Sequence, residues 1–129
     1  MKKLKLVLID DDAEFLNESK EMLEQTGYEV LCMKDSEYTV ERLRLEKPDV
    51  ILLDINLPDI NGFEALKILR SDPATAHIPV VALSANAMPL DTERGLKAGF
   101  FRYITKPIKV KELMDTLNVA LAYAAEGKV

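Results

Sequence analysis

Four short apolar runs in this chain each end in polar side chains that are able to do chemistry. The runs are residues 6–9, 50–53, 80–83 and 101–105, and the polar residues after them are Asp10, Asp11 and Asp12, then Asp54, then Ser84, then Lys106. In a parallel sheet the carboxyl ends of the strands lie along one edge, where open α/β sheets bind their ligands. We therefore expect these carboxylates, the hydroxyl and the ammonium to share one pocket. Such a set of groups suits a divalent cation, which prefers oxygen ligands, and a phosphoryl group, which pairs with an ammonium.

Strand-like and helix-like patterns alternate five times along the chain. The expected strands are residues 4–9, 28–33, 50–53, 79–83 and 101–105, and the expected helices are residues 13–26, 36–46, 63–70, 89–98 and 110–123. The continuous apolar run at 50–53 is typical of a central parallel strand that is covered on both faces. Short connections and right-handed crossovers then favour an α/β fold, a doubly wound (βα)5 parallel sheet of five strands with helices on both faces.

Local signals mark the ends and the inner faces of two helices. Asp12 is expected to cap the first helix at its amino end, and Gly27 is expected to end it as a C′ glycine. In the last helix, apolar residues at helical spacing form one stripe that we expect to face the core. The stripe consists of Val110, Leu113, Met114, Leu117, Ala120 and Leu121.

Length and composition predict one domain over residues 1–129, with a core from about 4 to 123. The chain is 48% hydrophobic and 30% charged, and its net charge of −5 argues against direct binding of nucleic acid, which needs a basic surface. The single cysteine, Cys32, excludes an internal disulfide and fits a reducing compartment. The amino end lacks the apolar region of a signal peptide, and no apolar stretch approaches the roughly 20 residues that span a bilayer. We expect a soluble, cytoplasmic protein without membrane contact.

The residues at the strand ends resemble those of a known family. In chain order, Ile9-Asp10-Asp11, Leu53-Asp54-Ile55-Asn56-Leu57-Pro58, Ser84-Ala85-Asn86 and Lys106-Pro107 resemble the response-regulator receiver domain of two-component signalling. The resemblance covers essentially the whole chain and implies the flavodoxin-like strand order 2-1-3-4-5. It also implies a phosphoacceptor that takes a phosphoryl group from the phosphohistidine of a histidine kinase or a histidine phosphotransfer protein.

The resemblance assigns Asp54 as the phosphoacceptor, a carboxylate nucleophile that forms an aspartyl phosphate. It assigns Mg²⁺, or Mn²⁺, to Asp11, Asp54 and the backbone carbonyl of Asn56, with Asp10 acting largely through a metal-bound water. Physical reasoning supports a cation here, because a carboxylate that attacks a phosphoryl group meets charge repulsion.

The same resemblance assigns the phosphoryl oxygens to Lys106, to the hydroxyl of Ser84 and to the backbone N–H of Ala85. It implies a cis peptide bond between Lys106 and Pro107, which would direct the lysine over the site. Ser84 and Tyr103 would form a switch: the hydroxyl moves toward the phosphoryl group, and the tyrosine ring fills the space left behind. The surface made by residues 89–98, the last strand and residues 110–123 would then change its affinity for a partner.

Asn56 and Asn86 occupy two variable positions that, by resemblance, influence how fast the phosphoryl group is lost. An amide can orient or exclude a water molecule but is a poor general base. We therefore expect slow to moderate self-dephosphorylation.

Each of these residues also has an ordinary structural interpretation. Asp10, Asp11 and Asp12 could be a solvated strand end before a helix cap, Asp54 and Ser84 loop or turn residues, Lys106 a surface charge, and Tyr103 a half-buried ring on an edge strand. The only histidine, His77, is expected to be exposed and incidental. The order of all four motifs favours the functional interpretation over these alternatives.

Two other functions stay open at this point. A Mg²⁺-dependent phosphohydrolase of the haloacid dehalogenase type would use Asp10 as its nucleophile, although Glu14 departs from the motif of that family. A pseudo-receiver would act only as an interaction module. We expect a signalling phosphoacceptor and not an enzyme, a monomer with dimerisation left open, and a downstream protein partner that the sequence does not identify.

Overall fold

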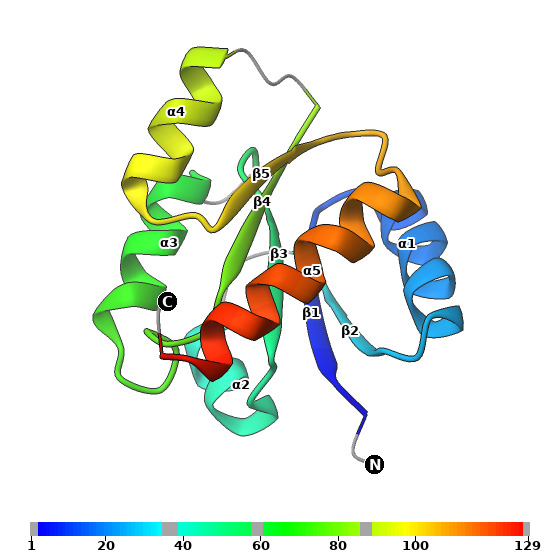
Figure 1. Ribbon diagram of the computed structural model, residues 1–129, viewed down its shortest axis with the longest axis horizontal. Helices are drawn as coiled ribbons and strands as arrows, with labels where there is room; N and C mark the ends of the chain where they lie inside the picture. Colours follow the sequence, from blue (N-terminus) through cyan, green and yellow to red (C-terminus); the bar gives the residue numbers. More distant parts are fainter. Residues whose placement is uncertain (1–2, 35–38, 58–60, 86–88, 128–129) are drawn as a thin grey trace.

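The computed structural model describes residues 3–34, 39–57, 61–85 and 89–127 (Figure 1). Five strands alternate with five helices in these residues. The strands are β1 (Lys5–Ile9), β2 (Glu29–Met33), β3 (Val50–Asp54), β4 (Val80–Ser84) and β5 (Arg102–Thr105), and the helices are α1 (Ala13–Gln25), α2 (Thr39–Glu46), α3 (Gly62–Ser71), α4 (Pro89–Ala98) and α5 (Val110–Ala125). The expected α/β fold and the alternation of elements are therefore confirmed.

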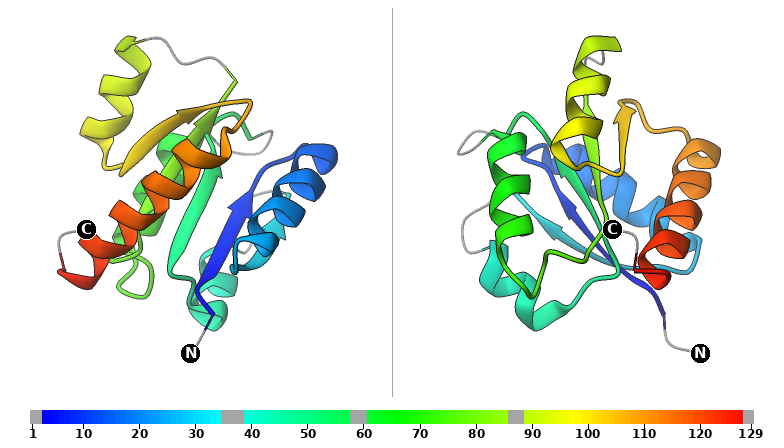
Figure 2. Two further views of the ribbon diagram at one scale, coloured as in Figure 1. Left: turned by 45° about the vertical axis from the view of Figure 1, so that its right-hand side comes forward. Right: turned by 60° about the vertical axis from the view of Figure 1, so that its left-hand side comes forward.

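The strands form one parallel sheet in the order β2-β1-β3-β4-β5. Helices α1 and α5 cover one face of this sheet, and α2, α3 and α4 lie on the other (Figures 1 and 2). The chain reverses direction across the sheet after β2, so the carboxyl ends of β1 and β3 lie side by side. This is the topological switch point at which such sheets bind ligands.

Side chains of each strand alternate between two cores, one on each face of the sheet. In β1, Val7 and Ile9 pack into the core under α2 and α3, whereas Leu6 and Leu8 pack into the core under α1 and α5. All residues of β3 and β4 are buried, as expected for central strands covered on both faces. Burial on both faces fixes the register, because a slip of one residue would exchange the side chains of the two faces.

The ends of α1 follow from its sequence. The side chain of Asp12 accepts hydrogen bonds from the backbone N–H groups of Glu14 and Phe15, which makes Asp12 the N-cap. At the other end Gly27 has a φ of 100°, and the N–H of Tyr28 donates to the carbonyl of Leu23. Both features belong to a Schellman ending, so the predictions for Asp12 and Gly27 are confirmed.

Most expected elements differ from the structure by one or two residues at an end, and some of these differences have a clear cause. Helix α3 begins at Gly62, one residue earlier than expected, because the side chain of Asn61 caps it by accepting from the N–H of Phe63. Val110 is 47% exposed, since it is the first residue of α5 and the buried stripe begins one turn later at Leu113. The second helix is described only from Thr39, and the expected residues 36–38 lie outside the described part. Within that part, no helix is both long and apolar enough to cross a membrane.

Candidate functional site

Three carboxylates meet at the carboxyl ends of β1 and β3. Asp10 and Asp11 follow β1, and Asp54 is the last residue of β3. One oxygen of each carboxylate can be chosen such that all three lie within 4.8 Å of one another. Asp10 is fully buried and Asp54 is 5% exposed, whereas Asp11 is exposed. The structure thus brings together three of the predicted site residues, two of them almost removed from solvent.

Backbone groups fix the two buried carboxylates. Oδ1 of Asp10 accepts from the N–H of Asp12 at 3.0 Å, and the N–H of Asp10 itself donates to the carbonyl of Met33 at 3.0 Å. Oδ1 of Asp54 accepts from the N–H of Asn56 at 2.9 Å. The second oxygen of each carboxylate, Oδ2, is the one that faces other side chains.

Lys106 supplies the positive charge that these oxygens face. Its Nζ lies 2.5 Å from Oδ2 of Asp10 and 3.6 Å from Oδ2 of Asp54, with the side chain 20% exposed. The backbone N–H of Lys106 donates to the carbonyl of Ser84 at 2.7 Å, which ties the segment after β5 to the end of β4. The peptide bond between Lys106 and Pro107 is cis, as the resemblance implies.

The surroundings of Asp54 disfavour the ionised form of its carboxyl group. Burial raises the pKa of Asp54 above its ordinary value, and the charges of Asp10 and Asp11 raise it further. The hydrogen bond from Asn56 and the charge of Lys106 act in the opposite direction but do not cancel the effect on this pKa. Excess negative charge in a partly desolvated site is what a bound cation would relieve.

The loop after β3 is held by a close backbone approach at Gly62. The N–H of Gly62 donates to the carbonyl of Ile55 at 2.9 Å, and a Cβ built on Gly62 would come within 2.4 Å of the Cα of Ile55. Asn56 and Asn61 form an isolated antiparallel bridge beside this contact. Only glycine permits this approach, and it sets the path of the backbone that carries Asn56.

The donor set fits a hard divalent cation. Carboxylate oxygens gathered within 4.8 Å are ligands of the kind that Mg²⁺ prefers, with its remaining positions left to water and phosphate. The exposed Asp11 leaves one side of the cluster open to solvent. The residues present are therefore compatible with the predicted Mg²⁺.

Comparison with known proteins gives the family. A sequence model of the response regulator receiver domain matches residues 6–118. The chain belongs to this receiver family. The polar-differentiation response regulator DivK of Brucella anthropi is 36% identical over 119 residues, which cover 92% of this chain and 97% of that protein. Protein PilH of Pseudomonas aeruginosa is 35% identical over 118 residues, which cover 92% of this chain and 98% of that protein.

One solved structure that is similar to this chain has the same fold. The receiver domain of the sensor histidine kinase PA1611 from Pseudomonas aeruginosa has 30% sequence identity to this chain and a TM-score of 0.84, with 94% of this chain and 99% of that chain covered. It is described with a magnesium ion coordinated in its active-site cleft. This receiver is thus a phosphoacceptor domain of two-component signalling, and receiver domains bind Mg²⁺ and interact with histidine kinases or phosphotransfer proteins. The comparisons give no support to the phosphohydrolase alternative.

Three other predicted site residues lie in β4 and β5 or directly after β4. Ser84 ends β4 and is 1% exposed, and Ala85 directly after it is exposed. Tyr103 lies in β5 with its ring half-buried, and its strand partner is Ala82, whereas the partner of Ser84 is Thr105. Asn86 lies outside the described residues.

One aromatic ring at the site, that of Phe15, is not among the functional residues that the sequence predicts. The ring centroid of Phe15 lies 4.4 Å from Nζ of Lys106. Helical periodicity places Phe15 on the inner face of α1, but it does not show that this face meets a lysine more than 90 residues later in the chain. No signal in the sequence of α1 alone distinguishes Phe15 from an ordinary core residue.

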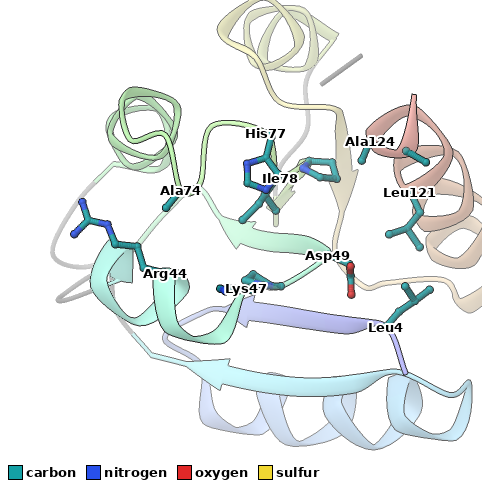
Figure 3. Close-up of a pocket in the computed structure, with 12 residues that line it drawn as sticks. Leu4, Arg44, Lys47, Asp49, Ala74, His77, Ile78, Leu121 and Ala124 are labelled. Carbon is teal, nitrogen blue, oxygen red and sulfur yellow. The ribbon is translucent and has the colours of Figure 1, made fainter. Parts of the chain in front are cut away.

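A separate pocket of about 600 Å³ lies at the opposite edge of the sheet (Figure 3). Leu4, Asp49 and Pro79, which line it, directly precede β1, β3 and β4. Oδ2 of Asp49 accepts from the backbone N–H of Lys5 at 2.8 Å. His77 at its rim is exposed, as expected. The cluster of Asp10, Asp11 and Asp54 does not line this pocket.

Proposed function

We propose that Asp54 is the residue that accepts the phosphoryl group, with Mg²⁺ as the cofactor. The observation that supports the proposal is the position of Asp54 among the other charged and hydrogen-bonding groups of the site. Its Oδ2 faces Lys106 at 3.6 Å, its Oδ1 is fixed by the N–H of Asn56, and Asp10 and Asp11 lie beside it. Asp10 is also buried in this cluster, but its Oδ2 is paired with Lys106 at 2.5 Å, which leaves Asp54 as the buried carboxylate whose Oδ2 is less engaged.

The cation would be held by the side chains of Asp10, Asp11 and Asp54 and by the backbone carbonyl of Asn56. Bound there, Mg²⁺ would neutralise the carboxylates and the incoming phosphoryl oxygens. The fixed backbone around Asp10 and Asn56 would limit the rearrangement needed for binding.

Transfer would then proceed in line between two nucleophiles. A bond forms between a carboxylate oxygen of Asp54 and phosphorus, while the bond from phosphorus to the donor imidazole nitrogen breaks and its electron pair leaves with that nitrogen. Lys106 exchanges its partner, Asp10, for a phosphoryl oxygen, and the Ser84 hydroxyl and the Ala85 N–H donate to the others. These groups act by positioning and by charge, which is how phosphoryl transfer is generally catalysed.

The response to phosphorylation would pass from Ser84 to Tyr103. A hydroxyl drawn toward the phosphoryl group vacates space at the end of β4, and the half-buried ring of Tyr103 moves into it. The surface of α4, β5 and α5 then changes its affinity for a downstream protein, as a population shift caused by one new charged group. We also propose slow to moderate self-dephosphorylation through the amides of Asn56 and Asn86.

We propose that residues 1–129 form one receiver domain with a core from about 4 to 123. The family match over residues 6–118 and the coverage of 97% of the related DivK protein support this extent. The donor is a histidine kinase or a histidine phosphotransfer protein, and the chain acts as a monomer unless its switched surface pairs with a second copy.

The test is phosphorylation by a small donor. Purified protein is incubated with acetyl phosphate and Mg²⁺, and its intact mass is compared with that of Asp54→Asn and of Asp115→Asn, a matched change at an exposed aspartate of α5. We expect one phosphoryl group on the parent and on Asp115→Asn, none on Asp54→Asn, and none on any protein after chelation. Equal labelling of all three proteins would show that Asp54 is not the acceptor.

A further inference from the structure

The ammonium of Lys106 has a third neighbour besides its two carboxylates. The ring of Phe15, half-buried on α1, lies with its centroid 4.4 Å from Nζ. This is within the distance of about 6 Å at which a cation over an aromatic face is attracted by the quadrupole of the ring. The ammonium therefore has three close neighbours, the carboxylates of Asp10 and Asp54 and a neutral aromatic face.

The turn that fixes Asp10 also fixes Phe15. The N–H of Asp12 donates to Oδ1 of Asp10 at 3.0 Å, and Oδ1 of Asp12 accepts from the N–H of Phe15 at 3.3 Å. The carboxylate and the ring that contact Lys106 are thus linked through one capping residue. These hydrogen bonds fix the Asp10 carboxylate and the backbone of Phe15 at the start of α1.

The two kinds of neighbour respond differently when the site is used. Lysine is a flexible point charge, and its ion pair with Asp10 weakens once other positive charge occupies the carboxylates. The attraction to a neutral ring does not depend on the charge state of the carboxylates. An aliphatic side chain of similar size would fill the same space but would not attract the ammonium.

We propose that Phe15 is a positioning residue that keeps the ammonium of Lys106 at the site while its carboxylate partners are engaged. The inference rests on the proposed function, in which Lys106 binds a phosphoryl oxygen. It predicts that the rate of phosphorylation of Asp54 follows the electron density of the ring at position 15. Removing the aromatic face lowers this rate by about two- to fivefold, the range expected for a partly exposed cation–π contact.

The first experiment detects the contact without any phosphorylation. In metal-free protein with labelled lysine, the protons next to Nζ of Lys106 should be shifted upfield by the ring current of Phe15, and the signal is assigned by its loss in Lys106→Arg. Phe15→Leu should abolish the shift. Phe63→Leu, which removes a half-buried ring on α3, should leave the shift unchanged. Absence of an upfield shift in the parent protein would overturn the proposal.

The second experiment measures function with ring volume nearly constant. Phenylalanines with one, two and three fluorine atoms are placed at position 15, which progressively weakens the quadrupole of the ring. We expect the logarithm of the phosphorylation rate with acetyl phosphate to fall with each fluorine, Phe15→Leu to be slower than the parent, and Phe15→Trp to retain the parent rate. Equal rates across the fluorine series would show that the ring acts only by packing and would overturn the proposal.

The two experiments separate this inference from the proposed function. A parent protein that accepts no phosphoryl group overturns the proposed function, and the role of Phe15 with it, even if the ring-current shift is present. A parent that is phosphorylated on Asp54 but lacks either the shift or the graded rate overturns the role of Phe15 alone.

Discussion

The ring of Tyr103 lies directly against the backbone of α4 at Gly95. A Cβ built on Gly95 would lie 2.6 Å from Cδ2 and 3.1 Å from Cε2 of the ring, and 3.7 Å from the ring of Phe100. Atoms of this kind do not approach so closely, so the observed position of Tyr103 requires glycine at position 95. The proposed switch residue is therefore in direct contact with a helix of the surface that it is proposed to control.

Replacement of Gly95 by alanine should have opposite effects in two backgrounds. Alanine stabilises a helix interior relative to glycine by about 0.5–1 kcal/mol, and this gain should appear when Tyr103→Ala has removed the ring. With Tyr103 present, the new methyl group must displace the ring, so we expect Gly95→Ala to lower the free energy of unfolding. Urea denaturation of the four proteins of this cycle measures the coupling. A stabilisation of equal size in both backgrounds would contradict the contact.

The close contact at Gly62 leads to a prediction about the cation site. Gly62→Ala places a methyl group 2.4 Å from the Cα of Ile55, so one of the two backbone segments must shift. We expect a loss of about 1–3 kcal/mol in stability, as for an overpacked core, together with weaker Mg²⁺ binding because Asn56 follows Ile55.

Gly27→Ala provides the matched control for this substitution. Gly27 has a φ of 100° but nothing within 4 Å of an added Cβ, so alanine there is strained only by its backbone conformation. It should destabilise the protein without changing Mg²⁺ affinity, which titration of each protein followed by calorimetry would test. Equal Mg²⁺ affinity in Gly62→Ala and the parent would show that the Gly62 contact does not position the loop.

The alternation of apolar runs and helical periodicities predicts the fold almost completely, because a parallel sheet that is covered on both faces buries every residue of its central strands. The strand ends likewise predict that Asp10, Asp11, Asp54 and Lys106 converge. Periodicity does not predict the contacts of Phe15 with Lys106 or of Gly95 with Tyr103. These contacts depend on how one helix is placed over the sheet, and the pattern of a helix shows which face is inward but not what that face meets.

The raised pKa of Asp54 predicts how stability changes with pH in metal-free protein. The folded state holds the Asp54 proton more tightly than the unfolded chain does. Its contribution to stability is therefore fully present below the unfolded pKa and is lost as the pH rises through the folded pKa. At neutral pH the ionised Asp54 carboxylate destabilises the fold, because it is buried beside Asp10 and Asp11.

Asp54→Asn should therefore be more stable than the parent at about pH 8 in the presence of chelator, and the difference should shrink as the pH falls toward about 5. Added Mg²⁺ should reverse the order, because it stabilises the parent more than the variant, which lacks one of the proposed carboxylate ligands. Denaturation with and without Mg²⁺ at several pH values measures both effects, with Asp115→Asn as the exposed control. A metal-free Asp54→Asn protein that is less stable than the parent at neutral pH would contradict the electrostatic account of this site.

Arg70 connects three segments around the carboxyl end of α3. From sequence, a charged residue in a helix is usually predicted to lie on the protein surface. Its Nη1 donates to the carbonyls of Ala76 at 3.0 Å and Ile78 at 2.7 Å, and its Nη2 donates to the carbonyl of Gly99 at 3.3 Å. The guanidinium is half-buried, and burial lowers its pKa from the ordinary value. The residue thus joins α3 to the segment before β4 and to the turn after α4.

Arg70→Met keeps the apolar stem but leaves three carbonyls without this donor. We expect a loss of about 2–3 kcal/mol in the free energy of unfolding, since hydrogen bonds from charged donors contribute about 1.5–3 kcal/mol each and water will partly replace them. Arg70→Lys should recover only part of the loss, because a single ammonium cannot reproduce the planar fork that reaches both loops. Arg102→Met is the control, as Arg102 is exposed on β5 and packs over Phe101. If urea denaturation gives equal stabilities for Arg70→Met and Arg102→Met, the three carbonyl contacts do not hold these loops together.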